Sequence, residues 1–301
     1  MPLEATLALA LLPDFALILL GASLRRLLHL GDHFWSGLEK LVYYVLFPAL
    51  LFTGLLKARI EWSEAAPMLA VAGAAMGGAM LLALAGRRFA ITPISFASQY
   101  QCAFRFNSYI GLAVAGTLYG IPGIAAMGIV IGLMVPPANL VAVGMLARHG
   151  EADIWRELVR NPLILATLAG MAANLAGLEL PAVLTKFLAR LGDAAVVLGL
   201  LAVGAGLRIV GAGGTATHAA AAYFLLVKLV AMPAIALLLI RAFGLSGVHA
   251  DVALIFAGLP AASSAYILAQ RMGGDGVRVA WLISAGTLAS MISIPLWLGL
   301  R

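Results

Sequence analysis

SQYQCAFRFNSYIGLAVAG, residues 98–116, is an apolar stretch with a polar centre, and its interpretation decides the fold. Arg105 and Asn107 stand near its middle, followed by Ser108 and Gly111. Asn and Gly tolerate non-helical backbone, so Asn107 and Gly111 predict a mild helix interruption within 106–112. An arginine at the centre of a membrane helix costs about 2.5–3.5 kcal/mol on insertion scales, so Arg105 indicates a specific role, such as contact with an anionic ligand.

A second stretch, FAGLPAASSAYILAQ at residues 256–270, repeats this pattern. Gly258 and Pro260 lie near its midpoint, and proline removes a backbone donor, which predicts a clear interruption within 257–261. Ser263 and Ser264 follow and can pair the freed backbone groups. Interrupted segments at matching places in two halves of a chain are typical of a transporter binding site, where a half-helix N-terminus suits a carboxylate. A simple proline kink is the alternative for this segment.

The composition of the chain points to lipid as its solvent. Of 301 residues, 63% are hydrophobic and 11% charged, and the mean hydropathy is +1.05. Soluble domains have about 45–50% apolar and about 25% charged residues, so a soluble enzyme, a disordered chain and a nucleic-acid-binding module are excluded. Strand alternation is absent, which disfavours a β-barrel.

The apolar runs predict an all-α membrane protein of ten transmembrane helices. Their approximate ranges are 5–24, 37–56, 66–86, 95–119, 123–147, 161–178, 187–207, 218–240, 251–270 and 278–299. We expect the interruptions in the fourth and ninth spans to lie less than about 10 Å apart, as packed helices allow.

Basic residues set the expected orientation. The loops after spans 1, 3, 5, 7 and 9 carry eleven: Arg25, Arg26, Lys40, Arg87, Arg88, Arg148, Arg156, Arg160, Arg208, Arg271 and Arg278. The opposite side carries six: Lys57, Arg59, Lys186, Arg190, Arg241 and Arg301. The positive-inside rule places the first set in the cytoplasm, so both termini are expected outside.

The two halves of the chain resemble each other weakly. LLPDFALILLGASLRRL in the first half corresponds to RNPLILATLAGMAANLAGL in the second, although two Leu/Ala-rich runs can match by accident. Five spans per half require the second copy to insert upside down, as in many secondary transporters. We therefore expect repeats at 1–148 and 161–301, joined by a cytoplasmic linker at 149–160.

Other polar residues receive weaker interpretations. Lys228, near the middle of span 8, is expected to have a gating or structural role ahead of ligand contact, and Asn139 and Tyr266 are placed in the same class. Two acids, Asp14 and Asp193, look closer to span ends. No histidine cluster, P-loop or HExxH motif is present, so no metal, cofactor or enzymatic activity is expected.

Five stretches together resemble the auxin efflux carrier family, whose plant members are the PIN-formed auxin carriers. They are KLVYYVLFPALLF (40–52), AFRFNSYIGLAVAGTLYG (103–120), NPLILATLAGMAANLAGLELP (161–181), VKLVAMPAIALLL (227–239) and GLPAASSAYILAQRMGGD (258–275). The likeness runs over the whole chain.

The resemblance implies two inverted five-helix repeats, similar to bile-acid sodium symporters and sodium–proton antiporters. A scaffold of spans 1, 2, 6 and 7 would support a transport domain of spans 3–5 and 8–10, which moves as an elevator. Broken helices 4 and 9 would cross at the site, and Asn107 would be the family's carboxylate-binding asparagine. The chain departs from the family at Ala113, where a proline is usual, and at Arg105, where many members have a small residue.

The resulting hypothesis is a secondary transporter of small organic anions, such as auxin-like, malate-like or malonate-like carboxylates. It would sit in a bacterial inner membrane, with a homodimer through the scaffold domain as a further expectation. An anion channel or uniporter and a ligand-sensing receptor without flux are the alternatives. The sequence leaves the substrate, the direction and the coupling ion, proton or sodium, open.

Overall fold

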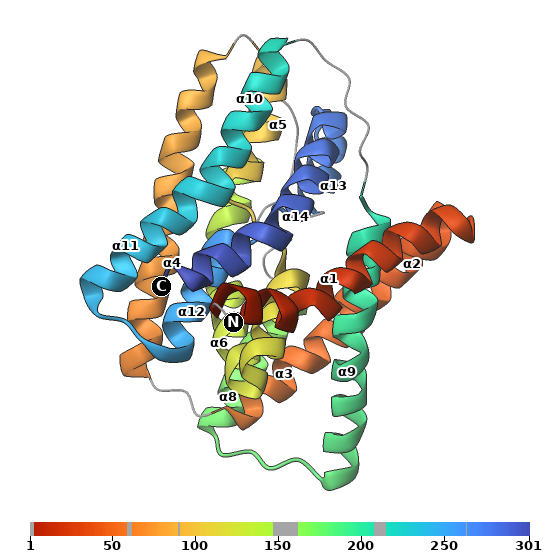
Figure 1. The fold of residues 1–301 in the computed structure, drawn as a ribbon. Helices are drawn as coiled ribbons and strands as arrows, with labels where there is room; N and C mark the ends of the chain where they lie inside the picture. The colour runs from red at the N-terminus through yellow and green to blue at the C-terminus, as the bar shows by residue number, and fades with distance from the viewer. Residues whose placement is uncertain (1–2, 59–61, 90, 147–161, 208–214, 263) are drawn as a thin grey trace.

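The computed structural model describes residues 3–58, 62–89, 91–146, 162–207, 215–262 and 264–301 (Figure 1). Every regular element in these ranges is a helix. Six helical stretches are long and apolar enough to cross a membrane, and two further apolar helices are shorter. The prediction of an all-α membrane protein is thereby confirmed. The expected linker at 149–160 lies outside the described residues.

The helices of the first half follow the apolar runs to within several residues. They are α1 (Leu3–Leu27), α2 (Asp32–Leu41), η1 (Val42–Leu46), α3 (Phe47–Lys57), α4 (Trp62–Ala83), η2 (Leu84–Arg88), α5 (Pro93–Tyr100), η3 (Gln101–Ala103) and α6 (Ser108–Leu146). The 39-residue α6 would measure about 58 Å at 1.5 Å per residue, almost twice the roughly 30 Å bilayer core. Gly120, with φ 58° and ψ −138°, breaks it into two parts.

The helices of the second half follow the same rule. They are α8 (Pro162–Leu175), α9 (Ala182–Ala205), α10 (Thr215–Leu226), η5 (Val227–Ala231), α11 (Met232–Phe243), α12 (Gly247–Gly258), α13 (Ser264–Arg271) and α14 (Gly276–Gly299). One expectation is wrong in both halves: Asp14 and Asp193 lie near the centres of α1 and α9, not near the ends of spans. For Asp193 the reason is that α9 begins at Ala182, before the expected start at residue 187, whereas Asp14 already stood at the middle of the expected range 5–24.

One group of helices packs through glycines. α1 lies against α9, and α3 lies against α8 and α9 (Figure 1). A Cβ added at Gly204 of α9 would sit 1.8 Å from the Ile18 carbonyl oxygen, and one at Gly21 would sit 2.1 Å from the Leu201 carbonyl oxygen. The two backbones therefore touch, as small residues permit in membrane helix pairs.

The remaining helices form a second group around α12. α12 packs against α4, α6, α11 and α14, and α11 runs beside α4 (Figure 1). Residues 250–260 are all buried, so the segment with the second interruption lies at the centre of this group. α1 also contacts α6 and α14, which joins the two groups.

Two prolines inside apolar helices are each preceded by a π-helical turn. η1 precedes Pro48 and η5 precedes Pro233. Proline lacks the N–H that would bond the carbonyl four residues back and clashes with that carbonyl, and a π-turn relieves the clash. For Pro233 that carbonyl belongs to Leu229, and the Trp297 indole N–H donates to it at 2.9 Å.

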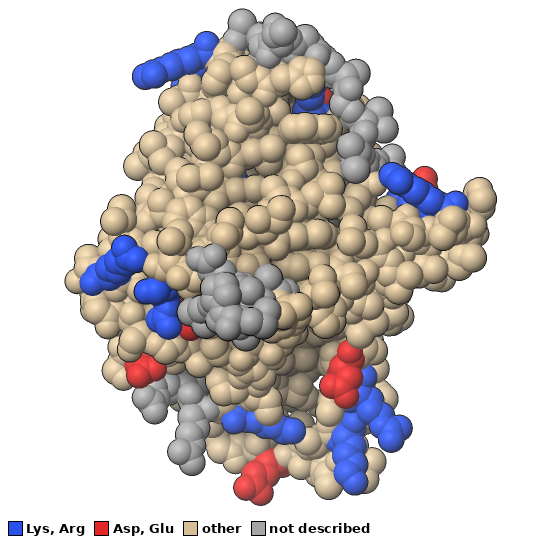
Figure 2. Space-filling view, in the orientation of Figure 1, with Lys and Arg blue, Asp and Glu red and all other residues tan. Residues whose placement is uncertain are grey.

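Charged side chains gather toward the margins of the molecule. Figure 2 shows a wide face without Lys, Arg, Asp or Glu between clusters of charge. Many large apolar side chains stay exposed on the chain, among them Leu81, Leu238 and Ile292 at 66–70%. A protein in water would hide such a surface, whereas a bilayer solvates it.

Candidate functional site

The two interrupted segments meet. The helix of α5 and η3 ends at Ala103 and α6 begins at Ser108, while α12 ends at Gly258 and α13 begins at Ser264. The Asn107 backbone N–H donates to the Pro260 carbonyl oxygen at 2.8 Å, which joins residues 153 positions apart in sequence. Both interruptions are buried from residue 104 to 107 and from 259 to 261.

The first interruption differs in place and degree from the prediction of a mild break within 106–112. It covers residues 104–107, lies before Ser108, and has as many non-helical residues as the described part of the second, 259–262. Gly111 does not take part, because it lies inside α6. Its Cα faces the second interruption, where a Cβ would be 2.9 Å from Leu259 Cδ1. Gly111 therefore serves close packing of the two segments, and Ala113 continues the helix.

Asn107 has a defined orientation. Its side-chain Oδ1 accepts from the backbone N–H groups of Tyr109 and Ile110, at 3.0 and 3.3 Å, so it caps the N-terminus of α6. This bonding fixes which end of the amide is oxygen. The amide nitrogen has no hydrogen-bond partner among the described residues, so its donors are available to a ligand.

Arg105 lies at the same place and is 8% exposed. Its Nη1 donates to Gln101 Oε1 at 3.0 Å, and its Nη2 donates to Ser264 Oγ at 2.8 Å. Gln101 is fully buried, and its Nε2 donates to the Ala265 carbonyl oxygen at 3.1 Å. Gln101 and Arg105 thus tie the first interruption to the first turn of α13.

Lys228 reaches the other side of the second interruption. Its Nζ is 3.4 Å from the Ala257 carbonyl oxygen and 3.1 Å from Met232 Sδ, and the residue is 1% exposed. Ala257 stands in the last turn of α12, where carbonyl groups lack helical partners and the helix dipole is negative. The gating or structural role expected for Lys228 stays a prediction.

The other residues that we singled out lie at different distances from the crossing. Ser108 is the first residue of α6 and is partly buried. Gly258 is the last residue of α12, and a Cβ added to it would lie 3.6 Å from Ile294 Cγ1. Tyr266 accepts a hydrogen bond from Gln270 at 3.2 Å. Asn139 lies in the second part of α6, beyond Gly120. Ser263 lies outside the described residues.

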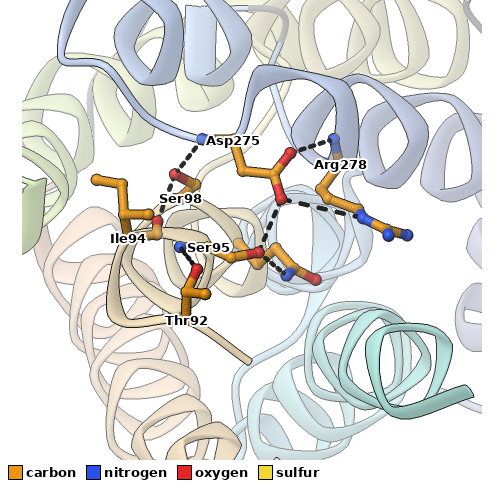
Figure 3. A network of polar contacts seen from close by, with 7 residues as sticks. Thr92, Ile94, Ser95, Ser98, Asp275 and Arg278 are labelled. Carbon is orange, nitrogen blue, oxygen red and sulfur yellow. Dashed lines mark hydrogen bonds and ion pairs between the residues drawn. The ribbon is translucent and has the colours of Figure 1, made fainter. Parts of the chain in front are cut away.

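A polar network holds α5 in place (Figure 3). The Ser95 hydroxyl donates to Asp275 Oδ2 at 2.8 Å, and the Asp275 N–H donates to Ser98 Oγ at 2.8 Å. Asp275 also caps α14 by accepting from the Arg278 N–H at 3.1 Å. The first half of the interrupted segment is therefore fixed to the loop before α14. Sequence reasoning missed this network and the role of Gln101, although the polar run after residue 95 was a signal for both.

The polar groups at the crossing are mainly hydrogen-bond donors, and this arrangement suits an anion. A guanidinium, an amide with available donors, a hydroxyl and two helix N-termini converge at one buried crossing. Within the described ranges, no three His, Cys, Asp or Glu side chains cluster so that they could hold a metal ion. A groove lined by apolar side chains, including Leu229, Leu296 and Trp297, lies between η5 and α14, away from these polar groups.

Comparisons with known proteins give a consistent result. Residues 148–298 match the family model described as membrane transport protein. A Methanothermobacter thermautotrophicus protein described as an uncharacterized transporter is 26% identical over 291 residues, which are 93% of this chain and 94% of that protein.

Plant relatives match a shorter region. The probable auxin efflux carrier component 1b of Oryza sativa subsp. japonica is 26% identical over 168 residues, 54% of this chain and 29% of that protein. Auxin efflux carrier component 1 of Arabidopsis thaliana is 29% identical over 149 residues, 48% of this chain and 24% of that protein. The chain thus spans less than a third of the length of these plant carriers. All three relatives bear the names of transporters, not of enzymes.

Proposed function

The chain belongs to the membrane transport protein family of the auxin efflux carriers, and we propose that it carries small organic anions as a secondary transporter. It is a multi-pass membrane protein with no enzymatic role. The observation that carries the proposal is the buried crossing, where Asn107 bonds to Pro260 at 2.8 Å and Arg105 bonds to Ser264 at 2.8 Å.

The chemistry of this crossing favours a carboxylate. Arg105 presents a planar fork of donors that matches a carboxylate, and the Asn107 amide nitrogen adds a second kind of donor. Ser108, Gly258, Pro260 and Ser264 line the same region in the proposal, with Gly111 allowing the close approach. Ser263 belongs to the proposed site by its position in the sequence. The substrate class is therefore small carboxylates, auxin-like, malate-like or malonate-like.

We further propose ten spans in two inverted repeats, 1–148 and 161–301. The break at Gly120 supports two spans within α6, and the interruptions support spans 4 and 9 as the matching broken helices. The scaffold would comprise α1, α2, α3, α8 and α9, and the transport domain the rest. The close backbone contact of α1 and α9 supports a rigid scaffold past which the second group slides as an elevator.

The remaining proposals concern the membrane, the orientation of the chain and its oligomeric state. We propose a bacterial inner membrane, both termini outside and a homodimer through the scaffold, from the basic-residue asymmetry and the family resemblance. An anion leaving the cell would be driven by about 2.3 kcal/mol per charge per 100 mV, so export needs no coupling ion whereas uptake does.

Counterflow in proteoliposomes tests the proposal against its two alternatives. Purified protein would be reconstituted, and uptake of radiolabelled malonate, malate and indole-3-acetate measured with and without the same unlabelled anion inside. A carrier gives saturable uptake that internal anion accelerates, and Arg105→Ala lowers it, whereas the exposed Arg190→Ala does not. Non-saturable flux without acceleration would indicate a channel. Thermal stabilisation by an anion without any flux would indicate a receptor.

A further inference from the structure

Asp14 is a buried acid near the middle of the apolar helix α1. It lies one residue before the centre of the 25-residue α1 and is 7% exposed. Leu11, Phe15 and Ile18 around it are buried apolar residues. Its Oδ2 accepts a hydrogen bond from the Thr117 hydroxyl of α6 at 2.8 Å. An ionisable residue buried among apolar side chains is a functional candidate, because its charge is expensive away from water.

A second aspartate shows how this protein otherwise treats a buried acid. Asp251 of α12 is 8% exposed, nearly the same as Asp14. The Arg301 Nε lies 2.5 Å from Asp251 Oδ1, so a cation compensates its charge. Asp14 has a neutral hydroxyl in the corresponding place, which compensates a full negative charge much less.

Within the described residues, no cationic side chain forms an ion pair with Asp14 as Arg301 does with Asp251. α1 packs against α6, α9 and α14. The titratable side chains that the structure describes on these elements are Arg25 and Arg26 on α1 itself, Tyr109 and Tyr119 on α6, Lys186, Arg190 and Asp193 on α9, and Arg278 on α14. Among the described residues, Thr117 is the hydrogen-bond partner that the Asp14 carboxylate has, and none of these groups forms an ion pair with it.

We propose that Asp14 is a proton-binding site, loaded and unloaded as α6 moves past α1. The inference rests on the proposed elevator, in which Thr117 travels with the transport domain and Asp14 stays with the scaffold. When Thr117 leaves, a charged Asp14 would lose its donor among apolar side chains. A hydronium ion then transfers a proton to the carboxylate, so that one O–H bond breaks in hydronium, leaving water, and one forms at Asp14. The reverse transfer to water, which regenerates hydronium, occurs when Thr117 comes back.

A proton fits this site better than a metal cation. Sodium needs several oxygen ligands, whereas one carboxylate and one hydroxyl are present here. Proton uptake at Asp14 would make carriage of an anion responsive to the pH on the side from which the proton comes. Such coupling would permit uptake against the membrane potential.

Infrared spectroscopy of the purified full-length chain tests the site without any substrate. Lowering the pH should produce the carbonyl band of a protonated carboxyl above about pH 5, where ordinary aspartates are charged. We expect Asp14→Asn to lose this band and Asp251→Asn to keep it. Thr117→Val, which retains the acid, should show the band at a higher pH because the charged form has lost its donor. Identical spectra of the wild type, Asp14→Asn and Thr117→Val would overturn the proposal.

A labelling experiment tests the link to movement. Ser108→Cys in a Cys102→Ser background places a thiol at the crossing, and its rate of modification by a maleimide reports exposure of the site. Because maleimide reacts with the thiolate, whose fraction itself depends on pH, the rate is divided at each pH by that of the exposed Arg190→Cys control in the same background. We expect this ratio to change with pH when Asp14 is present and to be independent of pH with Asp14→Asn. A ratio equally pH-dependent in both would overturn the coupling. Failure of the tested anions to be carried would count against the proposed function alone.

Discussion

At the scale of single residues, substitutions of Arg105 test whether its guanidinium binds the anion or only stabilises the fold. Arg105→Ala removes a buried guanidinium beside Ser264, and we expect anion affinity to fall by more than roughly tenfold. Arg105→Lys should restore part of it, since lysine lacks the planar fork. Titration calorimetry with the best anion of the panel measures this, with Arg190→Ala as control. Unchanged affinity in a folded Arg105→Ala protein would assign Arg105 to structure.

Asn107 allows its two functions to be tested apart. Asn107→Asp keeps an oxygen that can cap Tyr109 and Ile110 but replaces the amide donors with a negative charge. We expect it to retain thermal stability and lose anion binding. Asn107→Ala loses the cap as well and should be destabilised by about 1 kcal/mol. Equal anion affinity of the wild type and Asn107→Asp would contradict the assignment.

Single residues also show where sequence reasoning stops. Asn107 and Pro260 could be singled out because asparagine and proline disturb helices by their own chemistry. Gly111 was misassigned, since glycine serves both breaks and close packing, and only the neighbouring Leu259 decides between them. The bond of Gln101 to Ala265 joins residues 164 positions apart, which no local pattern encodes.

At the scale of helices, Trp297 supports the π-turn η5. Its indole N–H bonds to the Leu229 carbonyl, which cannot accept from Pro233 because proline has no N–H. Trp297→Phe keeps most of the ring and loses the donor, so we expect a loss of about 1–3 kcal/mol and a lower Tm. Trp281→Phe, also partly buried but without such a bond in the described chain, should change Tm little. A similar Tm for both variants would contradict the interpretation.

The α1–α9 contact gives a second prediction for the helices. Gly204→Ala would push a methyl group to 1.8 Å from the Ile18 carbonyl oxygen, so the helices must separate. We expect destabilisation of about 1–3 kcal/mol or more, measured by thermal unfolding. Gly77→Ala is the control, because nothing lies within 4 Å of its added Cβ. Sequence could predict that glycines pack helices but not which pair touches.

At the scale of the whole molecule, the orientation can be tested directly. Eleven basic residues against six predict that Arg88 is cytoplasmic and Gly120 is outside. In a Cys102→Ser background, an impermeant maleimide added to intact cells should label Gly120→Cys and not Arg88→Cys. Labelling of Arg88→Cys from outside would reverse the orientation.

The all-helical class, the apolar faces and the interrupted segments follow from hydropathy and from proline chemistry, so this part of the architecture was accessible from sequence. The burial of Asp14 was not, because hydropathy shows that α1 is apolar but not which of its side chains face other helices. Its pairing with Thr117 needs the packing of α1 on α6, which only the three-dimensional arrangement provides.

The central claim is that the crossing of the two interrupted segments is the anion site. The most direct test is a cryo-EM map of the protein with the carboxylate that stabilises it most. We predict ligand density within hydrogen-bond distance of the Arg105 guanidinium and the Asn107 amide nitrogen. Density elsewhere, such as in the apolar groove between η5 and α14 beside Trp297, with the crossing empty, would contradict the account.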